Sequence, residues 1–166
     1  MNRVRTLVIL MAPLFAASAN SEPVVEVSFV QPERYADAAP GSATFPRERE
    51  VVQAELRRHV EALSARYLVD GDRLAIEFLD IDLAGSREQI GGTLDVRVTR
   101  NRPMPALKIR YRLGRAGVES TGEETLRDLG FIRWDRCFEG ATLCYEKRLL
   151  DRWFASRFGA AAAPPG

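Results

Sequence analysis

The alternation of apolar and polar residues predicts a chain built from both strands and helices. Alternation with a period of two is typical of a strand with one buried face. It occurs at residues 25–29, 74–83, 94–98, 107–113 and, in a more polar form, 118–126. The second of these segments changes phase near Phe78, which predicts a β-bulge. Gly85, Gly91 and Gly92 predict a loop between the second and third strands.

Two other segments have the spacing of amphipathic helices. The first begins near Pro46, a residue that a first helical turn tolerates, and runs to about Tyr67. The second ends at Gly159, and residues 127–143 before it have no regular pattern. The stripes expected to face the core are Val52, Leu56, Leu63 and Tyr67 in the first helix, and Tyr145, Leu149, Leu150, Trp153, Phe154 and Phe158 in the second.

The order of these elements predicts the fold class. A strand, a helix, four strands mainly in hairpin order and a closing helix indicate an α+β domain. We expect a mainly antiparallel sheet of about five strands, with both helices packed on one face. A single domain of residues 20–158 accounts for all of these elements.

The first residues have the order of a secretory signal peptide. Arg3 and Arg5 precede an uncharged apolar stretch from Leu7 to Ala17, and the small residues up to Ala19 form a cleavage site. The apolar stretch is shorter than the roughly 20 residues that span a bilayer. We therefore expect residues 1–19 to be removed and the mature protein to be periplasmic or secreted. The alternative is an ordinary buried N-terminal helix. Residues 159–166 are expected to form a disordered tail.

The charge balance limits the class of partner. Removing residues 1–19 takes away two arginines and no acid, so 24 basic and 23 acidic residues become 22 and 23. Nucleic acid is not expected as the main partner, because its binding is favoured by a basic excess. No cysteine near the cleavage site is available for a lipid anchor, and no second apolar segment is long enough to cross a bilayer. Stable membrane insertion after cleavage is therefore not expected.

Cys137 and Cys144 are the two cysteines of the chain. An even count in an oxidising compartment favours a structural disulfide, worth about 2.5 kcal/mol for so small a loop. The alternative is a redox or metal-binding pair. Six residues separate the cysteines, unlike the two of a thioredoxin-like motif, and no histidine is nearby.

Three aspartates are the candidates for metal binding or carboxylate chemistry. Asp80 and Asp82 share one side of their strand, and a neighbouring strand is able to bring Asp95 close. The alternative interpretation is a solvent-facing sheet surface on which basic residues pair with these carboxylates. If unpaired, the same basic residues would form a surface for an anionic ligand or an envelope polymer. They are Arg97, Lys108, Arg110 and Arg112.

The sequence assigns no catalytic, cofactor-binding or metal-binding residue. His59 is the single histidine, lies in the middle of the first helix and has no identifiable partner, so we interpret it as a surface or half-buried residue. Phosphate-binding glycine loops, zinc-binding helices and nucleophile-elbow motifs are all absent from the sequence.

Four segments resemble the bacterial domain of unknown function 3016 family. They are residues 25–30, 79–85, 126–131 and 145–154, and the resemblance covers most of the mature chain. It implies an exported bacterial protein and no catalytic residue. The cysteine pair is not a feature of that pattern.

The expected function is that of a non-enzymatic periplasmic accessory or binding domain, whose charged sheet face or long loops meet a periplasmic protein or an envelope component. One alternative is a metal-dependent or carboxylate-based hydrolase of the cell envelope that uses the three aspartates. Another is a structural or stress-related envelope protein without a specific ligand. Carboxylates interleaved with arginines on a flat face would count against the hydrolase.

Overall fold

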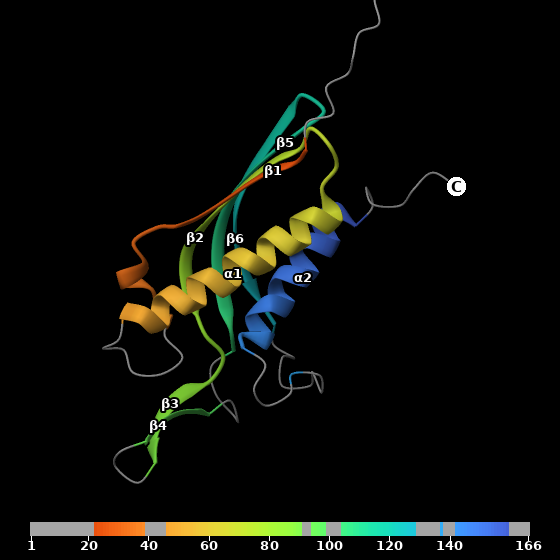
Figure 1. The fold of residues 1–166 in the computed structure, drawn as a ribbon. Coiled ribbons are helices and arrows are strands. Elements are labelled where there is room, and N and C mark those ends of the chain that lie inside the picture. The colour runs from red at the N-terminus through yellow and green to blue at the C-terminus, as the bar shows by residue number, and fades with distance from the viewer. Residues whose placement is uncertain are drawn as a thin grey trace, which may run out of the picture.

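The computed structural model describes residues 22–38, 46–90, 94–98, 104–128, 137 and 142–159. The predicted signal peptide, residues 1–19, lies outside this part, as does most of the predicted tail. The elements, shown in Figure 1, are β1 (Val24–Phe29), a short 3-10 helix η1 (Pro32–Arg34), α1 (Pro46–Tyr67), β2 (Arg73–Asp82), β3 (Ser86–Ile90), β4 (Leu94–Val98), β5 (Ala106–Arg115), β6 (Val118–Arg127) and α2 (Cys144–Phe158). No helix among the described residues is long and apolar enough to span a membrane.

The main sheet has four strands in the order β1-β2-β5-β6 and is mixed. The strands β2, β5 and β6 are antiparallel neighbours, as predicted, but β1 runs parallel to β2. The prediction of about five mainly antiparallel strands is therefore wrong in the number of strands and in this pairing. The physical reason is the long helix α1, which returns the chain to the end of the sheet where β1 began, so that β2 starts in the same direction.

The third predicted strand, β4, does not join the main sheet. It pairs with β3 in a separate antiparallel ribbon, with Ser86 opposite Val98 and Ile90 opposite Leu94. Residues 86–90 were expected to form a loop, and that expectation is wrong. Figure 1 shows the ribbon extending away from the sheet and the helices.

Both helices pack on one face of the main sheet, as predicted (Figure 1). The core between the layers is apolar, and its largest members have no exposed side-chain surface or almost none. Val60 joins the predicted stripe of α1, since it is fully buried, whereas Tyr67 is only partly buried. Fully buried residues of the two layers include Val52, Leu56, Phe78, Ile81, Leu107, Ile109, Leu150 and Phe154.

A disulfide links Cys137 to Cys144, the first residue of α2, with Cα atoms 5.6 Å apart. The two cysteines therefore lie at the distance that the predicted pairing requires. Because the two cysteines are seven positions apart in the sequence, the bond restrains the start of α2 and does not link segments that are far apart in the chain.

Candidate functional site

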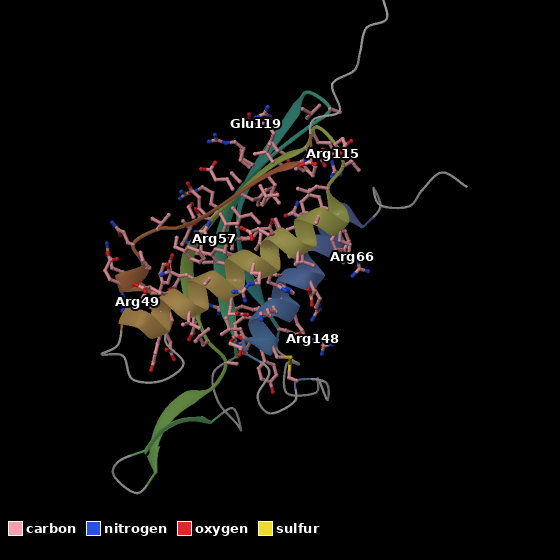
Figure 2. The ribbon with its side chains drawn as sticks, in the orientation of Figure 1. Arg49, Arg57, Arg66, Arg115, Glu119 and Arg148 are labelled. Atoms are coloured by element: carbon pink, nitrogen blue, oxygen red, sulfur yellow. A yellow bond between two sulfur atoms is a disulfide. The ribbon has the colours of Figure 1, made fainter. Side chains whose placement is uncertain are left out.

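The face of the main sheet opposite the helices is open and charged. Side chains alternate along each strand, so residues that do not face the core lie on this open face. On β5 these residues are basic, and on β6 they are glutamates and threonines. Figure 2 shows Glu119 and Arg115 on opposite sides of the β5–β6 hairpin, with Arg115 toward the helices. We define the open face by Glu26, Ser28, Arg73, Ala75, Glu77, Lys108, Arg110, Arg112, Glu119, Thr121, Glu123 and Thr125.

A ladder of ion pairs crosses the centre of the open face. Arg110 is on β5, which lies between β2 and β6, and it pairs with a glutamate of each neighbouring strand. Its Nη1 lies 2.8 Å from an oxygen of Glu77, and its Nη2 lies 3.2 Å from an oxygen of Glu123. The other two pairs join Lys108 to Glu123 at 2.8 Å and Arg112 to Glu119 at 3.3 Å. Each pair joins neighbouring strands, as cross-strand neighbours of opposite charge do.

These contacts favour the charged forms of Glu123 and Arg110. Hydrogen bonds from Lys108 and Arg110 lower the pKa of Glu123, and hydrogen bonds to Glu77 and Glu123 raise the pKa of Arg110. The ladder is exposed to solvent, so it contributes little to stability. It does fix the directions of three long side chains, which leaves the open face ordered before any partner binds.

A shallow groove runs beside the ladder, above β1, β2 and β5. It consists of two adjoining hollows of about 420 and 230 Å³ that share Glu26, Ala75 and Arg112. The groove exists because short residues lie among long ones: Ala75 and Gly114 form its floor, and Ser28 lies on its wall. Concave surfaces with a few converging polar groups are the usual sites of ligand binding.

Two charges of opposite sign line the groove without partners in the described part of the chain. Glu26 on β1 and Arg73 on β2 both contact the smaller hollow. Neither forms an ion pair or side-chain hydrogen bond with another described residue. An unpaired charge on a surface is available to a partner at a low desolvation cost. The groove therefore presents one free carboxylate and one free guanidinium.

The predicted aspartate site is not assembled in this structure. Asp80 lies opposite Lys108, but its Oδ1 accepts hydrogen bonds from the backbone N–H groups of Ala36 at 2.8 Å and Ile81 at 2.9 Å. Asp95 belongs to β4, where its backbone lies opposite Gln89 of β3. The expectation that a neighbouring strand brings Asp95 to Asp80 and Asp82 is wrong, because β4 leaves the main sheet.

The described residues contain no group of three potential ligands that could hold a metal ion. The partners predicted for the basic residues were also wrong. Lys108, Arg110 and Arg112 pair with glutamates of β2 and β6, and not with the aspartates. The bulge predicted near Phe78 is present between Phe78 and Asp80, and the phase change turns Asp80 and Asp82 from the core face to the open face at the end of β2.

Asp80 instead closes a gap in the sheet edge. The pairing of β1 with β2 stops at Phe29 and resumes as a single bridge between Asp37 and Asp82. Across the gap, the Tyr35 hydroxyl donates to the carbonyl of Phe78 at 2.8 Å. Burial is the main reason that the pKa of Tyr35 rises to about 12, so the phenol keeps its proton at every physiological pH.

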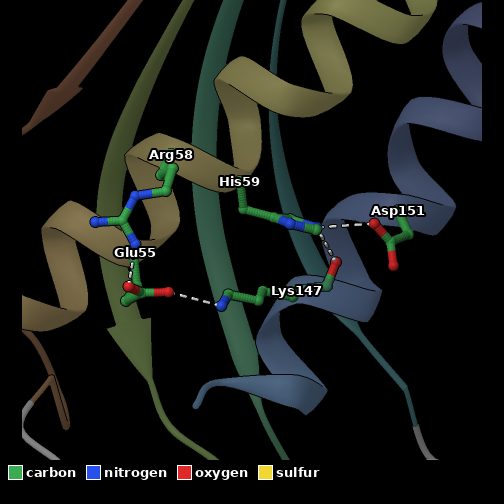
Figure 3. A network of polar contacts seen from close by, with 5 residues as sticks. All are labelled: Glu55, Arg58, His59, Lys147 and Asp151. Carbon is green, nitrogen blue, oxygen red and sulfur yellow. Dashed lines mark hydrogen bonds and ion pairs between the residues drawn. The ribbon is translucent and has the colours of Figure 1, made fainter. Parts of the chain in front are cut away.

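His59 does have a partner, which the sequence did not reveal. Its Nε2 lies 2.8 Å from Oδ1 of Asp151 and 3.2 Å from the carbonyl oxygen of Lys147 (Figure 3). Both neighbours are acceptors, so Nε2 carries a proton and donates. The half-buried position agrees with the prediction. The signal was missing because Asp151 lies 92 residues away on α2.

The same network contains an ion pair between the helices. Nζ of Lys147 lies 2.8 Å from Oε2 of Glu55, and Arg58 also pairs with Glu55 (Figure 3). The hydrogen bond from Lys147 is the largest cause of the lowered pKa of Glu55. No hydroxyl or thiol nucleophile belongs to this network, so its geometry indicates a clamp that joins α1 to α2 rather than a catalytic dyad.

A third polar contact is buried. Asp72, before β2, accepts hydrogen bonds from Arg115 at the end of β5, with Nη2 2.6 Å from Oδ2 and Nε 3.0 Å from Oδ1. Burial raises the pKa of Asp72, but the hydrogen bonds from Arg115 and from the N–H of Val69 lower it below its usual value. The pair fixes the α1–β2 turn against the β5–β6 hairpin.

Fold and site together define a two-layer α+β domain with an open, charged sheet face beside a shallow groove. The chain belongs to a family of proteins of unknown function, DUF3016, whose family model matches residues 23–156. This match confirms the resemblance seen in the sequence. No curated protein and no solved structure gives a significant match.

Proposed function

We propose that this chain is an exported bacterial accessory or binding protein that works in the periplasm without catalysis. It meets a periplasmic protein or an envelope component through the groove on the open face. The observation that carries this proposal is the pair of unpartnered charges, Glu26 and Arg73, beside a groove whose other charges are fixed by the ion-pair ladder. A partner with both a cationic and an anionic group would pair with both.

The interleaving of charges counts against the hydrolase alternative. Glutamates alternate with basic residues across the open face, and each of Lys108, Arg110 and Arg112 has a carboxylate partner. A carboxylate that a neighbouring cation holds in its charged form is a poor general acid. Asp80, one of the three candidate aspartates, accepts hydrogen bonds from the backbone of the sheet edge.

Native mass spectrometry of the protein isolated from its own periplasm tests the proposal. We expect a mass per chain that starts at Asn20 and a second species with a bound partner. The double variant Glu26→Gln/Arg73→Gln should lose the second species. A matched control, Glu61→Gln/Arg49→Gln on α1, should keep it. A cytoplasmic, unprocessed chain would overturn the export proposal, and a partner retained by the groove variant would overturn the binding site.

A further inference from the structure

We propose that two copies of this chain pair through their β6 strands, antiparallel and around a two-fold axis at Gly122. The pairing joins the two main sheets into one continuous sheet. This inference does not depend on the proposed function, because the two-fold axis is perpendicular to the sheet and leaves both open faces accessible on the same side.

The first step concerns which backbone groups of β6 are free. The β5–β6 hairpin turns through Ala116 and Gly117, which both have positive φ, and Arg115 pairs with Val118 directly after the turn. In such a two-residue hairpin this first pair is hydrogen bonded, and hydrogen-bonded pairs then recur at every second residue. The outward-facing backbone groups of β6 therefore belong to Glu119, Thr121, Glu123, Thr125 and Arg127.

These groups have no partner in the described part of the chain. No hydrogen bond from a backbone or a side chain reaches these outward-facing backbone groups among the described residues. The strand is ten residues long and keeps one register with β5 from end to end. Its Val118 is 70% exposed, the largest exposure among the large apolar residues described.

The two edges of the sheet differ in how they are protected. Edge strands are normally guarded by short length, proline, charged side chains, bulges or a covering element. The other edge, β1, has six residues, is interrupted after Phe29 by η1, and is capped by Arg57, whose Nη1 donates to the carbonyl of Val27 at 2.6 Å. The β6 strand contains no proline, lysine or bulge. Its charged side chains, three glutamates and Arg127, restrict strand addition to a partner whose charges fit them.

The charges of β6 select a second copy and one register. Residues opposite one another in an antiparallel pair lie on the same face, so only some registers are allowed. With Gly122 on the axis, Val118 lies opposite Leu126 and Thr121 opposite Glu123, twice each. The remaining opposite pairs are Glu119 with Thr125 and Ser120 with Glu124.

The neighbouring registers bring like charges together, which destabilises a strand pair. An axis at Thr121 places Glu119 opposite Glu123. An axis at Glu123 or at Glu124 places that glutamate opposite its own copy. Among the registers that pair most of β6, the one with Gly122 on the axis is therefore self-complementary, with an apolar pair near each end and no like-charge pair.

The oligomeric state of the mature protein purified from the periplasm tests the interface. Light scattering after size-exclusion chromatography should give twice the monomer mass. Thr121→Pro should give the monomer mass, because it removes an outward-facing N–H that β5 does not use. Its circular dichroism spectrum should stay close to that of the control Thr121→Ser, which should remain dimeric. A monomeric wild type, or a dimer that survives Thr121→Pro, would overturn the proposal.

Oxidative cross-linking tests the register. Thr121→Cys and Glu123→Cys are prepared as single variants and then mixed. The proposed register predicts a covalent dimer chiefly in the mixture, because residues 121 and 123 of the two copies lie opposite each other at a separation suited to a disulfide. Efficient cross-linking of Glu123→Cys with itself would place Glu123 on the axis and overturn the register. No cross-link in any sample would overturn the strand pairing.

Discussion

Arg115→Met should destabilise the protein strongly, because it leaves the carboxylate of Asp72 buried without its guanidinium. The side chain of Asp72 is 2% exposed and that of Arg115 is 26% exposed. Methionine can pack on the ring of Phe158, over which the Arg115 guanidinium lies with Cζ 5.5 Å from the ring centre, but it loses the cation–π attraction. The change therefore removes mainly the charge and its hydrogen bonds.

The expected loss in the free energy of unfolding is about 3 kcal/mol. Breaking one side of a buried ion pair typically costs about 3–5 kcal/mol, and the partial exposure of Arg115 places this pair at the lower end. A domain of this size has about 5–15 kcal/mol in total, so the loss is easily measured. The control is Arg112→Met, three residues earlier on β5. Arg112 is 70% exposed and pairs with an exposed glutamate, so that change should cost less than about 1 kcal/mol.

The pH dependence gives this prediction a second test. In the wild type the pKa of Asp72 is below its ordinary value of 3.8, so the stabilisation is present above that pH and is lost as the pH falls through the lowered pKa. In Arg115→Met, burial favours the neutral carboxyl group instead. Urea unfolding followed by circular dichroism should therefore show the largest gap between wild type and variant near neutral pH and a smaller gap near pH 3. A gap of equal size at both pH values, or one no larger than that of Arg112→Met, would refute the reasoning.

Three further predictions concern the scaffold. Gly122→Ala should lower the free energy of unfolding by about 1–3 kcal/mol, because a Cβ there would lie 2.7 Å from Cε1 of Tyr111. In the same thermal melts the control Gly114→Ala should cost less, because its Cβ would have its nearest contact at 3.8 Å. Cys137→Ser/Cys144→Ser should lower the free energy of unfolding by about 2.5 kcal/mol, and a reducing agent should reproduce that loss in the wild type but not in the variant. His59→Gln should cost less than about 1 kcal/mol, since Asp151 is partly exposed, and a loss as large as that of Arg115→Met would contradict this estimate.

The helices and most strands were predictable because their patterns are local. Val52 and Leu56 lie on one stripe of α1, and Leu107 and Ile109 alternate on β5, so burial against a single core determines both elements. The phase change at Phe78 likewise predicted the bulge. The parallel pairing of β1 with β2 was missed, although a long helix between two strands is the sequence signal for it. Residues 86–90 were missed as a strand because flanking glycines indicated a loop.

The sequence predicted which basic residues share the open face, but not which carboxylates they pair with. Alternation on β5 placed Lys108, Arg110 and Arg112 on one face, as observed. Their partners depend on which strands become neighbours, and that choice is made by the whole fold. The contact between His59 and Asp151 joins two helices far apart in the sequence, so no local pattern encodes it. The groove was also not predictable, since it depends on Ala75 and Gly114 lying on adjacent strands.

Photo-cross-linking in living cells tests the central claim, that an exported domain binds its partner through the groove. A photoreactive amino acid at Ser28, on the groove wall, should give a cross-linked product in the periplasmic fraction. The same product should disappear in the background Glu26→Gln/Arg73→Gln, and a probe at Glu61, on the exposed side of α1, should not give it. A product formed equally from Glu61, or one that persists in the charge-neutralised background, would contradict the account.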